Sequence, residues 1–311
     1  MRVVSMAALF MSLTVLLPAQ QPQFRSGART VAIYATVQDK GGRLVPDLTA
    51  EDFEIKDNGK VQPITVFSNE VQPITVVMML DRSGSMRGNF RLVEEAGRAF
   101  VRKLGPGDKA RIGVFADRIE IQPESFTSEP AQMLAILRSD LPVSGPTPLW
   151  NAVTDAITAV RDQDGRKVVL VFSDGADAPQ NFSFKNKSIM DVMRRAQQDN
   201  VMVYAIGLQT TVLRGPSGGG GFGGMTGSMT AQRPDPGLAI LAEDTGGGYF
   251  ELTRGENLAE TFARVADELH RQYAIGFEPP NLDGKMHEIE LKVKRGGMKA
   301  RARKEYYAAR P

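Results

Sequence analysis

The stretch ITVVMMLDRSGSM, residues 74–86, decides the fold. Its first half is a run of apolar and β-branched residues, which predicts a buried β-strand. Asp81 stands where the strand ends, and hydroxyl groups follow at Ser83 and Ser85 on either side of Gly84, which allows a tight turn. In open α/β sheets, ligands bind outside the carboxyl ends of the strands, so we expect these three side chains to converge on one point. Oxygen groups of this kind suit a hard divalent cation such as Mg²⁺ or Ca²⁺.

The pattern Asp81-x-Ser83-x-Ser85 resembles the metal-ion-dependent adhesion site of von Willebrand factor A domains. That family adds a threonine and an aspartate further along the chain, and this sequence offers Thr147 and Asp174. The resemblance implies that the three hydroxyls bind the cation directly, while the two aspartates act directly or through water. It implies Mg²⁺, or else Ca²⁺ or Mn²⁺. Neutral hydroxyl ligands leave the cation electron-poor, so the expected partner is a protein that presents a Glu or Asp carboxylate as a further ligand.

Each of these residues also has a purely structural interpretation. Asp81 and Ser83 could cap the helix that follows them, and Thr147 could cap a helix that begins with the next proline. Asp174, followed by glycine, could form a plain turn. We favour the metal site because all five positions occur in the right order, each at a predicted strand end or loop.

Strands and helices are predicted to alternate between residues 72 and 272, the part of the chain that the resemblance covers. This rhythm indicates a doubly wound, mainly parallel sheet of five or six strands, a Rossmann-like α/β fold. The predicted strands are residues 74–78, 110–115, 119–121, 167–172, 201–206 and 249–252.

A glycine-rich stretch, residues 209–235, interrupts this alternation. We expect it to be flexible, because a run of glycines cannot pack a core. A phosphate-binding loop is the functional alternative, but the stretch lacks the GxxxxGK[ST] arrangement. It leaves the carboxyl end of a predicted parallel strand, so it is expected to overhang the metal site and tune access without supplying ligands.

Antiparallel β structure is predicted on both sides of the α/β region, in residues 28–70 and 273–307. In the first segment, residues 61–67 read as one returning strand. Each segment is too small to be stable alone, so we expect the two to form one small antiparallel β domain. Residues 39–60 and 284–307 also resemble the ends of exported acidobacterial proteins related to von Willebrand factor A domains.

The first 20 residues are typical of a signal peptide, with Arg2 ahead of an apolar run over residues 3–17. We expect export to the periplasm, the cell envelope or the medium and no stable membrane span afterwards, with an uncleaved anchor as the alternative. The net charge of +2 predicts no strong attraction to nucleic acid. The chain has no cysteine, which excludes disulfides, thiol catalysis and cysteine-ligated metals.

An enzyme is the alternative class of function. Asp81 could serve a phosphatase of the haloacid-dehalogenase type, but such enzymes need a second acid two residues later, where Ser83 stands. A serine nucleophile would need a base, and the only histidines are His270 and His287, at a predicted helix end and in the C-terminal β region. The sequence therefore favours a metal-dependent binding module without catalytic residues. A metal-dependent hydrolase that uses Asp81 and a purely structural metal remain the alternatives.

Overall fold

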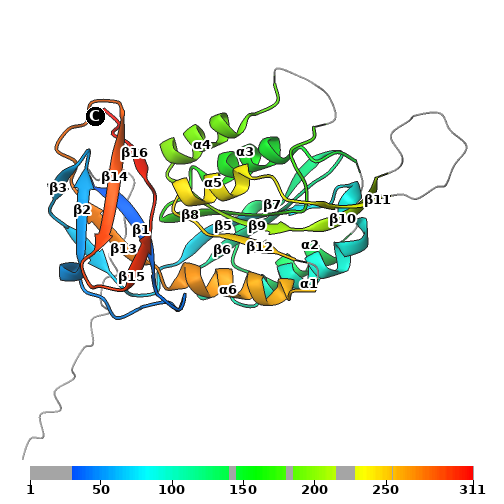
Figure 1. Ribbon diagram of the computed structural model, residues 1–311, viewed down its shortest axis with the longest axis horizontal. Helices are drawn as coiled ribbons and strands as arrows, with labels where there is room; N and C mark the ends of the chain where they lie inside the picture. The colour runs from blue at the N-terminus through cyan, green and yellow to red at the C-terminus, as the bar shows by residue number, and fades with distance from the viewer. Residues whose placement is uncertain (1–29, 140–144, 180–184, 215–227, 254, 311) are drawn as a thin grey trace, which may run out of the picture.

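The computed structural model describes residues 30–139, 145–179, 185–214, 228–253 and 255–310. Figure 1 shows two parts side by side: a sheet covered by helices on both faces, and a smaller all-β part that contains both ends of the described chain. Residues 1–29, with the expected signal peptide, lie outside the described residues. Within the described ranges, no helix is long and apolar enough to cross a membrane.

The α/β part is built on a six-stranded sheet of order β12-β9-β8-β5-β6-β7. Five strands are parallel, and β7 runs antiparallel to β6 at one edge. This confirms the predicted doubly wound, mainly parallel sheet. The strands are β5 (Ile74–Asp81), β6 (Lys109–Phe115), β7 (Ile119–Thr127), β8 (Arg166–Ser173), β9 (Val201–Leu208) and β12 (Tyr249–Leu252).

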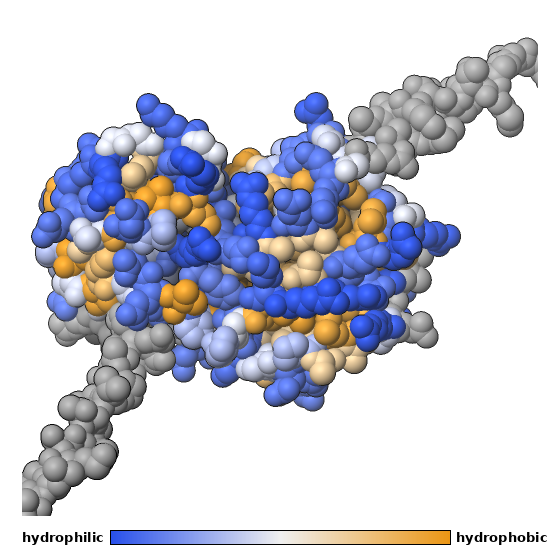
Figure 2. Space-filling model, turned by 90° about the horizontal axis from the view of Figure 1, so that it is seen from below, coloured by the Kyte–Doolittle hydropathy of each residue, from blue (hydrophilic) through white to orange (hydrophobic). Residues whose placement is uncertain are grey.

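Strand β5 lies in the middle of the sheet, and every one of its residues is buried. Val76 and Met78 belong to the core on one face, whereas Val77 and Met79 belong to the core on the other. This is why the strand reads as a continuous apolar run rather than an alternating one. The first face is covered by α1 (Phe90–Val101), α2 (Pro130–Arg138) and α6 (Leu258–His270), and the second by α3 (Leu149–Val160), α4 (Ile189–Gln198) and α5 (Gly237–Asp244). Figure 2 shows the molecule from the side of α1 and α6, with mainly hydrophilic residues over the α/β part.

The all-β part is a sandwich of two four-stranded antiparallel sheets, with strand orders β15-β1-β13-β4 and β16-β14-β2-β3. Each sheet mixes strands from the two ends of the chain, as the sequence predicts. The N-terminal strands are β1 (Val31–Asp39), β2 (Phe53–Asp57), β3 (Lys60–Gln62) and β4 (Val66–Ser68). The C-terminal strands are β13 (Tyr273–Phe277), β14 (Met286–Val293), β15 (Met298–Arg301) and β16 (Glu305–Tyr307).

The prediction of one strand over residues 61–67 is wrong. The chain pairs with β2 as β3, leaves that sheet, and joins β13 in the facing sheet as β4. Pro63 follows β3 directly, and it has no N–H to continue the ladder. The segment therefore crosses from one sheet of the sandwich to the other.

Two short strands stand where the sequence predicts only a flexible stretch. β10 (Thr210–Arg214) and β11 (Ser228–Gln232) form an antiparallel hairpin, and the glycine-rich residues 215–227 between them lie outside the described residues. The expectation for residues 209–235 is therefore corrected at both ends. Threonine and valine in β10 supply the β-propensity that the glycine run lacks.

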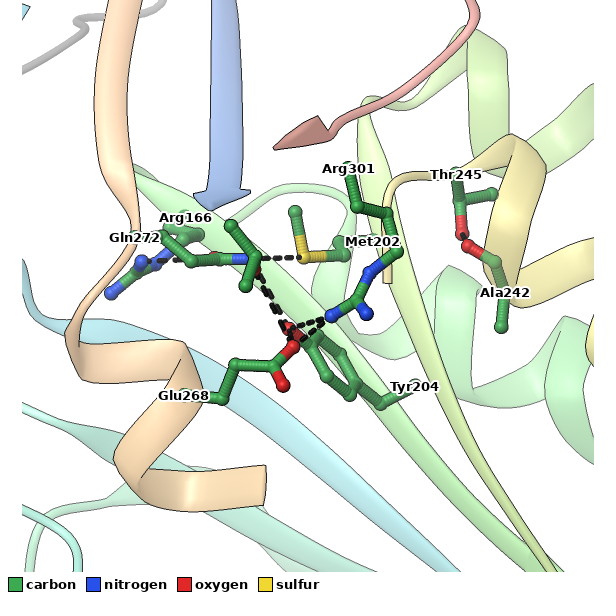
Figure 3. A network of polar contacts seen from close by, with 9 residues as sticks. Arg166, Met202, Tyr204, Ala242, Thr245, Glu268, Gln272 and Arg301 are labelled. Atoms are coloured by element: carbon green, nitrogen blue, oxygen red, sulfur yellow. Dashed lines mark hydrogen bonds and ion pairs between the residues drawn. The ribbon is translucent and has the colours of Figure 1, made fainter. Parts of the chain in front are cut away.

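A buried polar network joins the sandwich to the α/β part (Figure 3). Glu268 of α6 is 1% exposed, accepts a hydrogen bond from the Tyr204 hydroxyl at 2.6 Å and forms an ion pair with Arg301 of β15. Arg166, at the start of β8, donates to Gln272 Oε1 at 3.1 Å, and Gln272 lies between α6 and β13. The starts of the parallel strands therefore meet the sandwich, and their carboxyl ends point away from it.

Candidate metal centre

The candidate residues lie at the end of the sheet that is remote from the sandwich. Strand β5 ends at Asp81, and a short 3-10 helix, Gly84–Asn89, begins three residues later. The neighbouring parallel strand β8 ends at Ser173, so Asp174 follows beside Asp81. At about 3.3 Å per residue, the eight residues of β8 separate this end from Arg166 by roughly 25 Å.

Four of the five predicted residues are connected by hydrogen bonds. The Ser85 hydroxyl donates to Asp174 Oδ1 at 2.8 Å and lies 3.2 Å from the Ser83 hydroxyl. The Ser83 backbone N–H donates to Asp81 Oδ1 at 2.8 Å. Two carboxylates and two hydroxyls therefore come together at one point.

Thr147 is placed beside this group through its backbone. It forms a two-way bridge with Ala178, with N···O distances of 2.9 and 2.8 Å. Two residues earlier, Gly145 accepts a hydrogen bond from the Gly84 N–H at 3.2 Å. Gly145 has φ of +109°, and a Cβ there would lie 2.9 Å from the Asp117 nitrogen, so only glycine fits this contact. The Thr147 segment is thus tied to the serine loop.

Capping accounts for the Asp81 carboxylate only in part, through the Ser83 N–H, and it does not account for the hydroxyls of Ser83 and Thr147. Ser83 stands at the start of the 3-10 helix, but its side chain makes no capping hydrogen bond. At α3, the Trp150 N–H donates to Asp177 Oδ1 at 3.2 Å, so the carboxylate of a different loop caps that helix. The serine and threonine hydroxyls are therefore not needed to satisfy helix ends.

Ser173 belongs to the group and was not singled out from the sequence. Its hydroxyl donates to Asp81 Oδ2 at 2.6 Å and accepts from the Gly175 N–H at 3.2 Å. Its position directly before Asp174, at the end of the strand next to β5, is the signal that could have identified it. It fixes the direction of the Asp81 carboxylate.

The two carboxylates are buried without a neighbouring positive side chain in their hydrogen-bond contacts. Asp81 and Asp174 are both 0% exposed. Burial raises the pKa of Asp81, and burial, with a smaller contribution from the charge of Asp81, raises the pKa of Asp174 to about 6. Asp174 Oδ2 has no hydrogen-bond partner. Such an uncompensated oxygen, beside two hydroxyls, fits a hard divalent cation.

Removing the charge of Asp174 should stabilise the metal-free protein. Its ordinary pKa is 3.8, so above pH 6 the folded state holds a buried charge that the unfolded state solvates. We expect Asp174→Asn to raise the free energy of unfolding by about 2 kcal/mol at pH 7.5 in EDTA. The gain should shrink as the pH falls through 6 toward 4, as urea denaturation would measure. A gain that does not change with pH would contradict this account.

A hollow of about 200 Å³ lies next to the Thr147 segment. Its lining includes Pro146 and Pro148, on either side of Thr147, together with Arg118 and Asn151. None of the five candidate site residues lines it, so it is a neighbour of the Thr147 segment and not part of the group itself.

Both histidines are engaged in structural contacts away from this group. His270 Nε2 lies 2.7 Å from Asp108 Oδ2, and His287 Nδ1 lies 2.8 Å from Asp57 Oδ1 inside the sandwich. Neither is paired with a serine of the candidate site. Across the described ranges, no three His, Asp or Glu side chains gather as a metal site, so the candidate site relies on hydroxyls beside its two carboxylates.

Comparison with known proteins adds a family match. Residues 76–176 match the model of the von Willebrand factor type A domain. No curated protein sequence matches the chain significantly.

Several solved structures are similar to this one. An aerotolerance-related membrane protein from Bacteroides fragilis has 17% identity and a TM-score of 0.48, over 63% of this chain and 98% of its own. Proximal thread matrix protein 1 from the mussel byssus, with a zinc-occupied metal-ion-dependent adhesion site motif, has 17% identity and a TM-score of 0.48, over 68% and 49%. A von Willebrand factor type A protein from Catenulispora acidiphila has 13% identity and a TM-score of 0.48, over 92% and 76%.

Proposed function

Because residues 76–176 match the model of the von Willebrand factor type A domain, we propose that the protein is an exported interaction module that binds a partner through a divalent cation. Asp81, Ser83, Ser85, Thr147 and Asp174 would hold the cation, with Mg²⁺ as the best candidate. The bound ion would supply a Lewis-acidic centre that a partner's Glu or Asp carboxylate can complete. The observation that carries the proposal is the buried, unpartnered Asp174 Oδ2 next to the Ser83 and Ser85 hydroxyls.

The position of the site supports binding of a macromolecule. The site lies at the carboxyl ends of the parallel strands, while the sandwich is attached at their other ends. A partner can therefore reach Ser85, which is exposed, without meeting the sandwich. The hollow beside Pro146 and Pro148 would take the residue next to the partner's carboxylate. Export, from the signal-like first 20 residues, remains part of the proposal.

Catalysis is less well supported by the geometry. A nucleophilic Ser83 or Ser85 would need a general base within hydrogen-bond reach. The two histidines of the chain are paired with Asp108 and Asp57. The carboxylate that accepts from the Ser85 hydroxyl is that of Asp174, which we assign to the cation.

Asp81→Ala should abolish Mg²⁺ binding and leave the fold intact. The substitution removes a buried carboxylate whose pKa is raised by burial, and this removal favours the folded metal-free protein. It also removes the acceptor of the Ser173 hydroxyl, which is the one loss of stability that we expect. Isothermal titration calorimetry measures the binding. The control is Asp117→Ala, an exposed acid beside the hollow, which should bind Mg²⁺ as the wild type does. Equal binding by wild type and Asp81→Ala would refute the site.

Partner capture tests the function itself. The full mature chain, incubated with native cell-envelope extract, should retain a partner in Mg²⁺ and lose it in EDTA. Ser83→Ala and Thr147→Ala should lose it as well. Capture that survives EDTA and both substitutions would place the interface elsewhere and make the metal purely structural.

A further inference from the structure

The β10–β11 hairpin follows β9 (Figure 1), and the segment after the hairpin contacts the loop that carries Asp174. On the return side, the Asp235 N–H donates to the Gly175 carbonyl at 3.3 Å, and Asp235 Oδ2 accepts from the Asp177 N–H at 3.2 Å. On the outgoing side, β9 pairs with β8 as far as Gly207 opposite Ser173, and the hairpin begins three residues later at Thr210. The segment after the hairpin therefore lies against residues 174–177, and the segment before it leaves the sheet beside Ser173.

Thr210 brings a hydroxyl to the candidate centre. Its Oγ1 is buried and has no hydrogen-bond partner. It lies close enough to Asp174 to oppose, in part, the rise that burial causes in the pKa of that carboxyl. Asp174 Oδ2 is also buried without a partner of good hydrogen-bond geometry. Each of these two buried oxygens costs free energy as long as it has no partner.

We propose that Thr210 is a positioning residue of the metal centre, whose hydroxyl donates to Asp174 Oδ2 when the cation is bound. This inference rests on the proposed metal-dependent function. Ser85 already holds Asp174 Oδ1 at 2.8 Å, so a donor on the second oxygen would fix the carboxylate plane toward the cation. The hairpin, rather than only overhanging the site, would then contribute a side chain to it. The residue stands at the base of the hairpin, in register with Gln232, so closing the hairpin sets the position of the hydroxyl.

Two substitutions at Thr210 distinguish the effect of its hydroxyl group from the effect of its side-chain shape. Thr210→Val keeps the β-branched side chain and strand propensity, while Thr210→Ser keeps the hydroxyl. Thr158→Val is the matched control, because it removes an exposed threonine hydroxyl that bonds only within α3. Isothermal titration calorimetry gives the Mg²⁺ affinity of each variant, and thermal melting in EDTA gives the stability of the metal-free fold.

We expect Thr210→Val to weaken Mg²⁺ binding roughly 10-fold or more, the usual effect of losing a residue that orients a metal ligand. Thr210→Ser should restore the affinity, Thr158→Val should not change it, and the metal-free melting temperature should not fall in any of the three. Unchanged affinity in Thr210→Val, with binding lost in Asp81→Ala, would overturn this inference and leave the proposed function standing. So would a loss of affinity that Thr210→Ser fails to restore. A wild type that binds no Mg²⁺ would overturn both.

Discussion

Truncation after Arg271 should release the N-terminal half of the sandwich and make it sensitive to proteases. The truncation removes β13 to β16, and β1 then loses both of its neighbours, β13 and β15. β4 loses its partner β13, and β2 keeps only the three-residue strand β3. A two-stranded remnant of this size cannot hold a core in water. Limited proteolysis with mass spectrometry should show new cleavages within residues 31–68.

The expected contrast is between the two parts of the chain. The six strands of the α/β sheet and all six helices α1 to α6 lie before Arg271, so most of that core is retained. Full-length protein treated in parallel is the control. If residues 31–68 stay as protected in the truncated chain as in the full chain, the sandwich does not depend on pairing between the two ends.

Glu268→Ala should destabilise the protein by about 3 kcal/mol, the largest effect that we expect from one substitution. The carboxylate is 1% exposed and forms an ion pair with Arg301. It also accepts hydrogen bonds from the Tyr204 hydroxyl and, at 3.4 Å, from the Thr36 hydroxyl. Removing one partner of a buried pair leaves the other charge uncompensated, which costs about 3–5 kcal/mol. Arg301 is 25% exposed and can regain some water, so the lower end of that range applies.

Urea denaturation can be followed through Trp150, which is the only tryptophan of the chain and is buried in α3. Glu268→Gln keeps the length of the side chain and one hydrogen-bond acceptor oxygen, so this variant should lose less stability than Glu268→Ala. Glu260→Ala, an exposed acid on the same helix, is the control and should change stability by no more than about 0.5 kcal/mol. A Glu268→Ala variant as stable as this control would show that the network does not join the two parts.

Strand β1 illustrates where sequence reasoning stops. Alternation over residues 30–37 predicts a half-buried strand with Val31, Ile33, Ala35 and Val37 on one face, and these residues pack inside the sandwich. The sequence alone suggests that the other face meets solvent, yet Ala32 and Tyr34 are buried in the core of the α/β part. Alternation shows which face of a strand is apolar. It does not show that another part of the chain covers the opposite face, when that face carries small or aromatic residues.

The sequence by itself determines the α/β sheet and the order of the five candidate metal-site residues. Both are encoded locally: β5 needs only its own apolar run, and Asp81, Ser83 and Ser85 lie within one turn. The tertiary structure alone decides which residues complete the site's surroundings. Ser173 reaches the Asp81 carboxylate because β8 pairs with β5, and the contact proposed for Thr210 requires that β9 pairs with β8. Such contacts join residues that are far apart in the chain. They form only when the strands have paired, so a pattern within one short stretch of sequence cannot predict them.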